Sequence, residues 1–93
     1  MTFPVDFPEY PILPEDRARQ LLAFEAANPH PRGGQKEDSI RRELGLTPAR
    51  YWQLLLRLIQ TEQALQIDPT TTYRLRRLAA AAETATRART GHH

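Results

Sequence analysis

A helix stop followed at once by a helix start, in the stretch Gly45-Leu46-Thr47-Pro48, constrains this chain more than any other feature. Glycine at the end of a helix adopts the left-handed conformation at the least cost, because it has no Cβ. Thr47 can cap a following helix, and Pro48 suits its first position, where a backbone N–H is not needed. The stretch therefore predicts two helices joined by a tight turn, the pattern of a helix-turn-helix.

The apolar residues on both sides of this turn have helical spacing. Ile40 and Leu44 lie one helical turn apart before Gly45. After the turn, apolar residues recur at the i, i+3, i+4, i+7, i+8 spacing of one buried face: Tyr51, Leu54, Leu55, Leu58 and Ile59. We expect these residues to form the core side of the helix pair.

Polar residues form a second stripe on the helix that begins at Pro48. Arg50, Gln53, Arg57 and Gln60 recur at i, i+3, i+7 and i+10, opposite the core face and without an acidic residue among them. Arg and Gln have the hydrogen-bonding geometry to recognise guanine and adenine edges in a major groove. The stripe is therefore typical of a DNA-reading helix, but it is also typical of the solvated side of any amphipathic helix.

The N-terminal third of the chain divides into an arm, a helix and a linker. Residues 1–14 hold prolines at 4, 8, 11 and 14 with aromatic residues between them, which excludes helix and predicts an extended arm. The alternatives are a disordered tail and an arm packed on the body or on a partner, and the exposed aromatic residues favour an arm that is at least partly docked. Pro14-Glu15-Asp16 begins a helix that continues to about Ala27. Its apolar face comprises Ala18, Leu21, Leu22 and Phe24. Residues 28–34 break the helix and place His30 in an exposed linker.

Two further helical segments follow Ile59. Residues 60–67 form a short amphipathic piece that closes the core through Ala64, Leu65 and Ile67. Asp68-Pro69 then begins a final helix to roughly Arg87. We expect its buried stripe to comprise Thr71, Leu75, Leu78 and Ala82. The sequence thus predicts an all-α fold: an extended Pro-rich arm (1–14), a small helix-turn-helix bundle of about four helices (15–88) and a C-terminal tail (89–93).

The charge of the chain is unevenly distributed. The formal net charge of the 93 residues is +2, but residues 1–27 carry −3 and residues 69–93 carry +4, with five arginines against Glu83. A basic C-terminal part favours an anionic partner. Of the 13 basic residues only Lys36 is not arginine, a composition that suits phosphate binding and that a GC-rich genome would also produce.

Several classes of function are not supported by the sequence. The chain has no cysteine, so it has no disulfide framework and no thiolate nucleophile or metal ligand. It shows no Gly-rich phosphate loop and no His and carboxylate residues at metal-ligand spacing, and we therefore expect neither enzyme activity nor a metal or cofactor. No apolar run is long enough to span a membrane, and the N-terminus lacks a signal-peptide pattern, so we expect a cytoplasmic protein.

The stretch Ser39–Leu56 resembles a family of small proteins from high-GC Gram-positive bacteria and their phages, a domain of unknown function with helix-turn-helix character. The resemblance continues through residues 62–69 and Tyr73–Leu78 and covers about residues 20–80. The chain departs from the family pattern at residues 26–31, where members typically extend the first helix with a Trp-rich segment. Arg41 also stands four positions before Gly45, where common helix-turn-helix repressors have a small residue, and we expect it either to point outward or to be accommodated by a wider helix crossing.

The pattern and the resemblance together predict a DNA-binding protein, either a transcriptional regulator or an accessory factor, whose helix from Pro48 enters the major groove of double-stranded DNA. The base-edge candidates are Arg50, Gln53 and Arg57. The DNA-backbone candidates, which position rather than specify, are Arg41, Arg42, Thr47, Trp52, Arg74, Arg76 and Arg77. The alternative is a protein-interaction adaptor on the transcription machinery that uses Trp52, Leu56 and the aromatic arm. The same surplus of apolar surface would also suit a homodimer.

Overall fold

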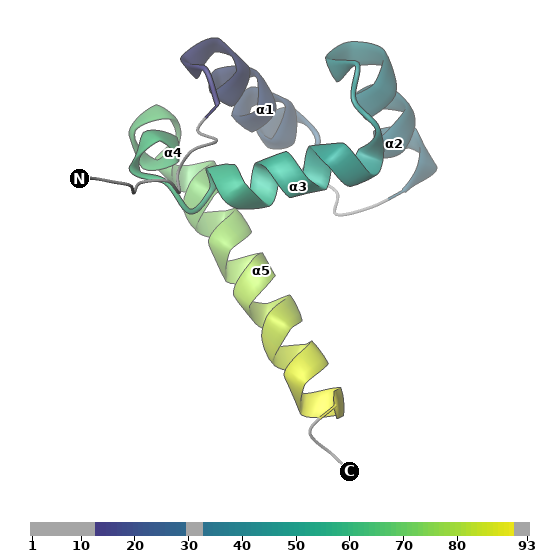
Figure 1. Cartoon of the computed structure of the whole chain (residues 1–93), viewed down its shortest axis with the longest axis vertical. Helices are drawn as coiled ribbons and strands as arrows, with labels where there is room; N and C mark the ends of the chain where they lie inside the picture. The colour runs from purple at the N-terminus through teal and green to yellow at the C-terminus, as the bar shows by residue number, and fades with distance from the viewer. Residues whose placement is uncertain (1–12, 30–32, 91–93) are drawn as a thin grey trace, which may run out of the picture.

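The computed structural model of the chain describes residues 13–29 and 33–90, and all regular structure in this part is helical (Figure 1). The elements are α1 (Glu15–Ala27), α2 (Gly34–Ser39), the π-helical turn η1 (Ile40–Leu44), α3 (Pro48–Leu58), α4 (Glu62–Ile67) and α5 (Pro69–Thr90). The predicted all-α class is confirmed. The prolines and aromatic residues of the predicted arm, at positions 1–12, and His30 lie outside the described residues.

Helix α1 follows the sequence prediction closely. Pro14 precedes its first turn, where Glu15 and Asp16 lie near the positive end of the helix dipole. The four apolar residues expected on its inner face are all buried: Ala18, Leu21, Leu22 and Phe24. The helix ends at Ala27, and the side-chain Nδ2 of its C-cap residue Asn28 donates to the Phe24 carbonyl at 3.0 Å. Immediately before α1, Leu13 packs against the core and its carbonyl accepts a hydrogen bond from Gln63 of α4.

The connection from η1 to α3 also has the predicted local structure. Ile40 and Leu44 are buried, and Gly45 is left-handed with φ 68°. The Thr47 hydroxyl then accepts a hydrogen bond from the Arg50 N–H at 3.1 Å, which caps α3. Four of the five residues predicted for the core face of the second helix are buried: Tyr51, Leu55, Leu58 and Ile59. The fifth, Leu54, lies at the edge of this face, where it is partly buried and packs against the core.

The C-terminal helices begin as expected, but the buried stripe of α5 is shorter than predicted. The Asp68 carboxylate caps α5 by accepting from the Thr71 N–H at 3.1 Å. Thr71 and Leu75 are buried, whereas Leu78 is 51% exposed and Ala82 is also exposed. The stripe prediction was wrong at these two positions because α5 extends past the end of the helices that cover its first half.

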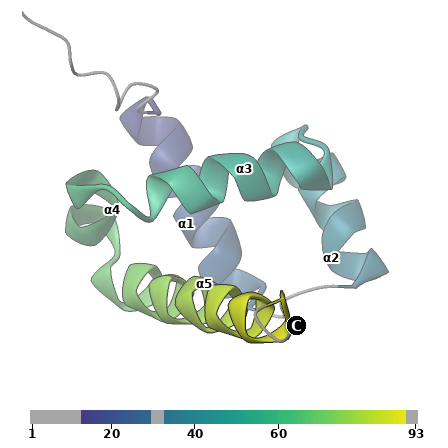
Figure 2. The ribbon, with the colours of Figure 1, turned by 60° about the horizontal axis from the view of Figure 1, so that its bottom comes forward.

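Helix α5 gives the described part of the chain an elongated shape. Helices α1, α3 and α4 lie around its N-terminal half, and its C-terminal half projects away from them in Figure 1; in Figure 2 this half is turned toward the viewer and foreshortened. A helix of 22 residues is about 33 Å long. The radius of gyration is 14.8 Å, against about 12 Å for a compact domain of this length. None of the described helices combines the length and the apolar character that a membrane crossing requires.

Candidate functional site

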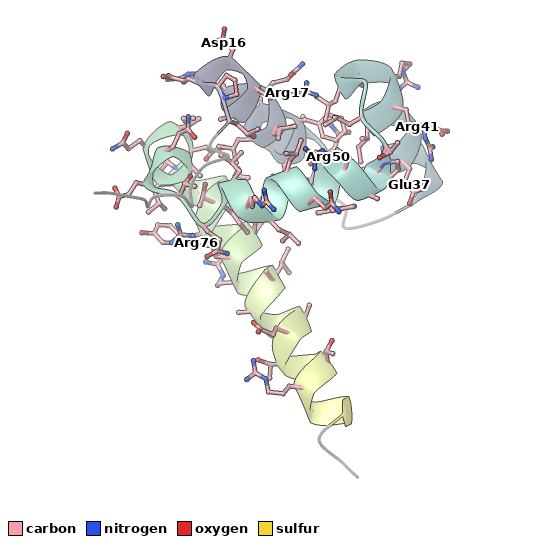
Figure 3. All side chains as sticks on the ribbon, viewed as in Figure 1. Asp16, Arg17, Glu37, Arg41, Arg50 and Arg76 are labelled. Carbon is pink, nitrogen blue, oxygen red and sulfur yellow. The ribbon has the colours of Figure 1, made fainter. Side chains whose placement is uncertain are left out.

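The exposed polar face of α3 is the first candidate site. Arg50, Gln53, Arg57 and Gln60, which follow one another along the outer side of α3 and the turn after it, are all exposed. Arg50 lies on α3 as labelled in Figure 3, and its guanidinium donates to the Gln53 side-chain oxygen at 3.2 Å. The helix contains no acidic residue. The three predicted base-edge residues, Arg50, Gln53 and Arg57, therefore share one solvated, positively charged surface.

Two of the predicted backbone-contacting arginines lie on η1. Arg41 and Arg42 are both exposed, and Arg41 points away from the body of the molecule as expected (Figure 3). Arg41 pairs with Asp38 at 3.6 Å, and Arg42 contacts Glu43 at 3.9 Å and the Ser39 hydroxyl at 3.2 Å. Pairs this exposed contribute little to stability, so exchanging these partners for another anion has a low cost.

Arg74 and Arg76 lie in a different environment from the one expected. Arg76 donates from Nε to the Ile59 carbonyl at 2.5 Å and from Nη2 to the Thr61 carbonyl at 3.4 Å, where it satisfies acceptors left open at the end of α3. Arg74 is half-buried and lies 3.7 Å from the Glu25 carboxylate. Both side chains are therefore engaged with the protein itself, because the ends of α1 and α3 come against this part of α5. Arg77 is exposed.

The remaining two backbone candidates, Thr47 and Trp52, lie on different sides of α3 and have different roles in the fold. Thr47 is exposed and caps α3, next to the polar face. Trp52 is half-buried on another side of the helix, edge-to-face with Tyr51 at a centroid distance of 5.1 Å. The Lys36 ammonium lies 5.0 Å from the centre of the Trp52 ring, within the range of a cation–π interaction. Trp52 therefore does not belong to the exposed polar face.

A buried polar cluster that the sequence reasoning missed joins α1, α2, α3 and α5. Its centre is Glu25, which is only 1% exposed. The Lys36 ammonium lies 3.0 Å and 3.2 Å from its two carboxylate oxygens, the Tyr51 hydroxyl donates to it at 2.5 Å, and Arg74 approaches it as well. Burial, and then the hydrogen bond to Glu25, raise the pKa of Tyr51 well above its ordinary value, so the hydroxyl stays protonated and donates.

The position of Glu25 on the apolar face of α1 could have predicted this cluster from the sequence. Glu25 lies seven residues after Ala18 and four after Leu21, and therefore on the apolar face of α1. A carboxylate at such a position needs a buried positive partner. The only lysine of the chain, Lys36, supplies it.

An apolar groove lies between α3 and α5, and we call it the α3/α5 groove. It has a volume of about 550 Å³, and its apolar walls include Trp52, Leu56, Leu78, Ala79 and Ala82. Leu56 and Leu78 are 48% and 51% exposed, so the groove is an open apolar surface rather than part of the core. Glu25 of the buried cluster also contributes to its lining.

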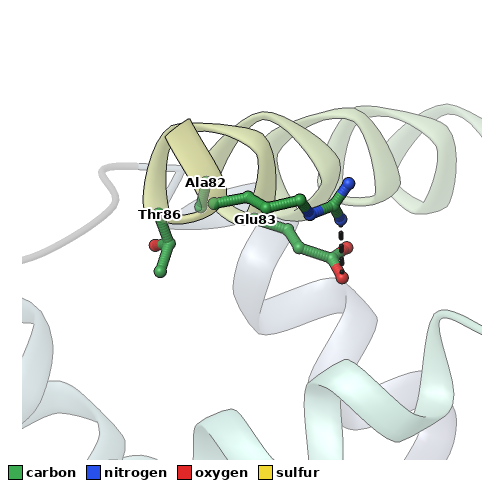
Figure 4. A pocket seen from close by; sticks show the side chains of 4 residues that line it. Ala82, Glu83 and Thr86 are labelled. Carbon is green, nitrogen blue, oxygen red and sulfur yellow. Dashed lines mark ion pairs between the residues drawn. The ribbon is translucent and has the colours of Figure 1, made fainter. Parts of the chain in front are cut away.

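A second hollow lies on the projecting half of α5. It is lined by Ala82, Glu83, Thr86 and Arg87, and its charged groups, Glu83 and Arg87, pair with each other at 3.3 Å (Figure 4). Across residues 13–29 and 33–90, no three His, Cys, Asp or Glu side chains gather in a way that could hold a metal ion.

Comparison with known proteins assigns the family of the chain but not its activity. Residues 14–89 match the family described as "Protein of unknown function (DUF3263)", and the chain belongs to that family. The predicted resemblance to a small family of unknown function is thereby confirmed, and the match extends it through the whole of α1 and nearly all of α5. Comparison with curated proteins and with solved structures gives no match.

Proposed function

We propose that the protein binds double-stranded DNA by placing the outer face of α3 in the major groove, as a transcriptional regulator or an accessory DNA-binding factor. The observation that carries the proposal is the exposed face formed by Arg50, Gln53 and Arg57 on a helix without acidic residues. Arg can bind guanine and Gln can bind adenine through paired hydrogen bonds in that groove. The 11 residues of α3 span about 16 Å, enough for several side chains to reach successive bases.

The start of α3 suits a DNA phosphate. Its first turn carries no acidic residue, and the exposed Thr47 marks the end at which the helix dipole is positive. Arg41 and Arg42 lie on the preceding element η1, and with the exposed Arg77 they are the phosphate-binding candidates that the proposal retains. Helix, turn and second helix would then act as a helix-turn-helix, with α2 and η1 as its first part.

The proposal no longer relies on three of the residues that the sequence suggested as contacts to the DNA backbone: Arg74, Arg76 and Trp52. The guanidinium groups of Arg74 and Arg76 contact backbone carbonyls of the protein itself, and Trp52 contacts Tyr51 and Lys36. These contacts give all three residues a structural role, which the experiment below avoids perturbing.

The second candidate function is a protein-interaction adaptor on the transcription machinery. The α3/α5 groove favours it, because Leu56 and Trp52 present apolar surface that a partner could cover. Salt distinguishes the two functions: DNA affinity falls steeply with ionic strength, whereas apolar docking in this groove changes little.

The proposal is tested by selecting a preferred duplex from a random pool and titrating it, and a scrambled duplex, at two salt concentrations. Gln53→Ala should weaken binding to the selected duplex by about 1–3 kcal/mol and leave the scrambled duplex nearly unaffected. Gln66→Ala, an exposed glutamine on α4, is the matched control and should change neither.

Arg77→Ala tests, in the same assay, a contact to DNA phosphate rather than to the base edges. It should weaken both duplexes alike and make the salt dependence shallower by about one unit of slope. Failure of the unmodified protein to bind either duplex at low salt would refute DNA binding and favour the adaptor.

A further inference from the structure

The exposed apolar surface of the described chain is concentrated in the α3/α5 groove. Three large apolar side chains are well exposed in the part of the chain that the structure describes. Two of them, Leu56 and Leu78, line the groove, and the third, Tyr73, does not. Scattered exposed apolar residues are ordinary, but side chains from two helices that share one hollow form a patch. Such a patch is stabilised when another surface covers it.

The projecting half of α5 supplies a surface of the right kind. Its last buried residue is Leu75, and residues 80–88 are all exposed. A segment of this length is marginal as an isolated helix in water, because packing supplies most of the stability of a helix. Leu78, Ala79, Ala82 and Thr86 lie at i, i+1, i+4 and i+8, so that one uncharged stripe runs from the groove wall onto the projecting half.

The groove wall and the projecting half both belong to α5, so the apolar surface of one copy can pack against the same surface of another copy. In a two-fold dimer each copy must present both the receiving and the inserted surface. Helix α5 does so, since Leu78, Ala79 and Ala82 form one wall of the groove and the same stripe continues beyond it. The small alanine side chains allow two helices to approach closely.

Charges beside the stripe favour an antiparallel arrangement of the two helices. Arg76 and Glu83 are seven residues apart and therefore lie on the same side of α5. Arg76 also donates to carbonyls at the end of α3 in its own chain, and Glu83 also pairs with Arg87, so each adds a long-range charge to this side rather than an unpaired group. In an antiparallel pair with its two-fold axis midway between them, beside Ala79, Glu83 of each copy comes opposite Arg76 of the other. A parallel pair would place like charges at the same level instead.

We propose that the protein forms a homodimer in which the α5 helices of two copies pack antiparallel through the α3/α5 groove. Trp52 and Leu56 of one copy cover the projecting half of α5 from the other. The dimer uses none of the exposed polar residues of α3, and it does not depend on DNA binding.

The first test compares two glutamate substitutions on α5 by sedimentation equilibrium of the full chain. Leu78→Glu places a charge in the groove and should weaken dimerisation at least tenfold. Tyr73→Glu is the matched control, because Tyr73 is equally exposed on the same helix but lies outside the groove. Equal effects of the two substitutions, or a chain that is monomeric at all concentrations up to several hundred micromolar, would overturn the proposal.

The second test uses the absence of natural cysteine. Ala79→Cys, on the stripe and beside the two-fold axis, should form an intermolecular disulfide rapidly under mild oxidation, whereas Ala80→Cys, on another side of the helix, should not. Cross-linking of Ala80→Cys at the same rate would refute the interface. If neither variant cross-links, the groove has another occupant, such as residues 1–12 of the same chain or a partner protein, and the homodimer is refuted. Neither test involves DNA, so this outcome leaves the proposed DNA binding unaffected.

Discussion

Replacing Lys36 with methionine removes the positive partner of the buried Glu25 carboxylate and keeps a side chain of similar length. Both side chains are almost wholly buried, with exposures of 4% for Lys36 and 2% for Glu25. Removing one partner of a buried ion pair costs about 3–5 kcal/mol, because the remaining charge is left in a poorly solvated site. Tyr51 and Arg74 still contact Glu25, so we expect the lower end of this range, about 3 kcal/mol.

A loss of this size would be a large part of the stability of the protein. A chain of 93 residues has a free energy of unfolding of about 5–14 kcal/mol. A loss of about 3 kcal/mol should lower the melting temperature by about 12–24 °C in a domain of this size. Urea denaturation followed by circular dichroism at 222 nm measures the change directly, at a single protein concentration for all variants.

The matched control is Arg19→Met, which breaks the ion pair between Arg19 and Glu15 on α1. The two charged groups are closer there, at 2.6 Å, but their side chains are 58% and 60% exposed. We therefore expect a loss of no more than about 1 kcal/mol. If Lys36→Met and Arg19→Met destabilised the protein equally, burial would not govern the strength of the Glu25 cluster and the reasoning would be wrong.

A double variant separates the buried charge from lost packing. Glu25→Met combined with Lys36→Met leaves only the charge of Arg74, whose side chain is 33% exposed, without its partner, and should be more stable than Lys36→Met alone. A double variant that is less stable than the single one would show that the carboxylate itself holds the four helices together.

Two further predictions concern the core face of α3. Leu58→Ala, at a position 2% exposed, should cost about 2–5 kcal/mol in chemical denaturation, and Leu54→Ala, at a partly buried position, should cost clearly less; equal losses would contradict the assigned face. The raised pKa of Tyr51 means that the folded chain keeps a proton which the unfolded chain loses above pH 10, so stability should fall as pH rises above that value, by about 1.4 kcal/mol per pH unit from this group. Tyr51→Phe should remove this part of the alkaline slope, and an unchanged slope would refute the assignment.

The helix boundaries could be predicted from the sequence because the signals that fix them are local. Gly45 tolerates a left-handed backbone, while Thr47 and Asp68 offer oxygens to N–H groups only three residues away. The apolar faces of α1 and α3 followed for the same reason, since helical periodicity decides which residues share a side. These signals do not depend on where the other helices lie.

The environment of each polar residue was decided by the tertiary structure. Arg76 and Arg77 are neighbours in the sequence, yet Arg76 caps the end of α3 and Arg77 is exposed, because only one of them faces Ile59 and Thr61. Glu25 gains Lys36 and Tyr51 as partners across 11 and 26 residues of chain.

The tertiary structure also determined how much of the apolar surface of α5 stays exposed. Leu75 and Leu78 belong to one sequence stripe, but the other helices cover only the first of them. Periodicity determines which side of a helix is apolar, whereas the length of the elements packed against it determines how much of that side is buried.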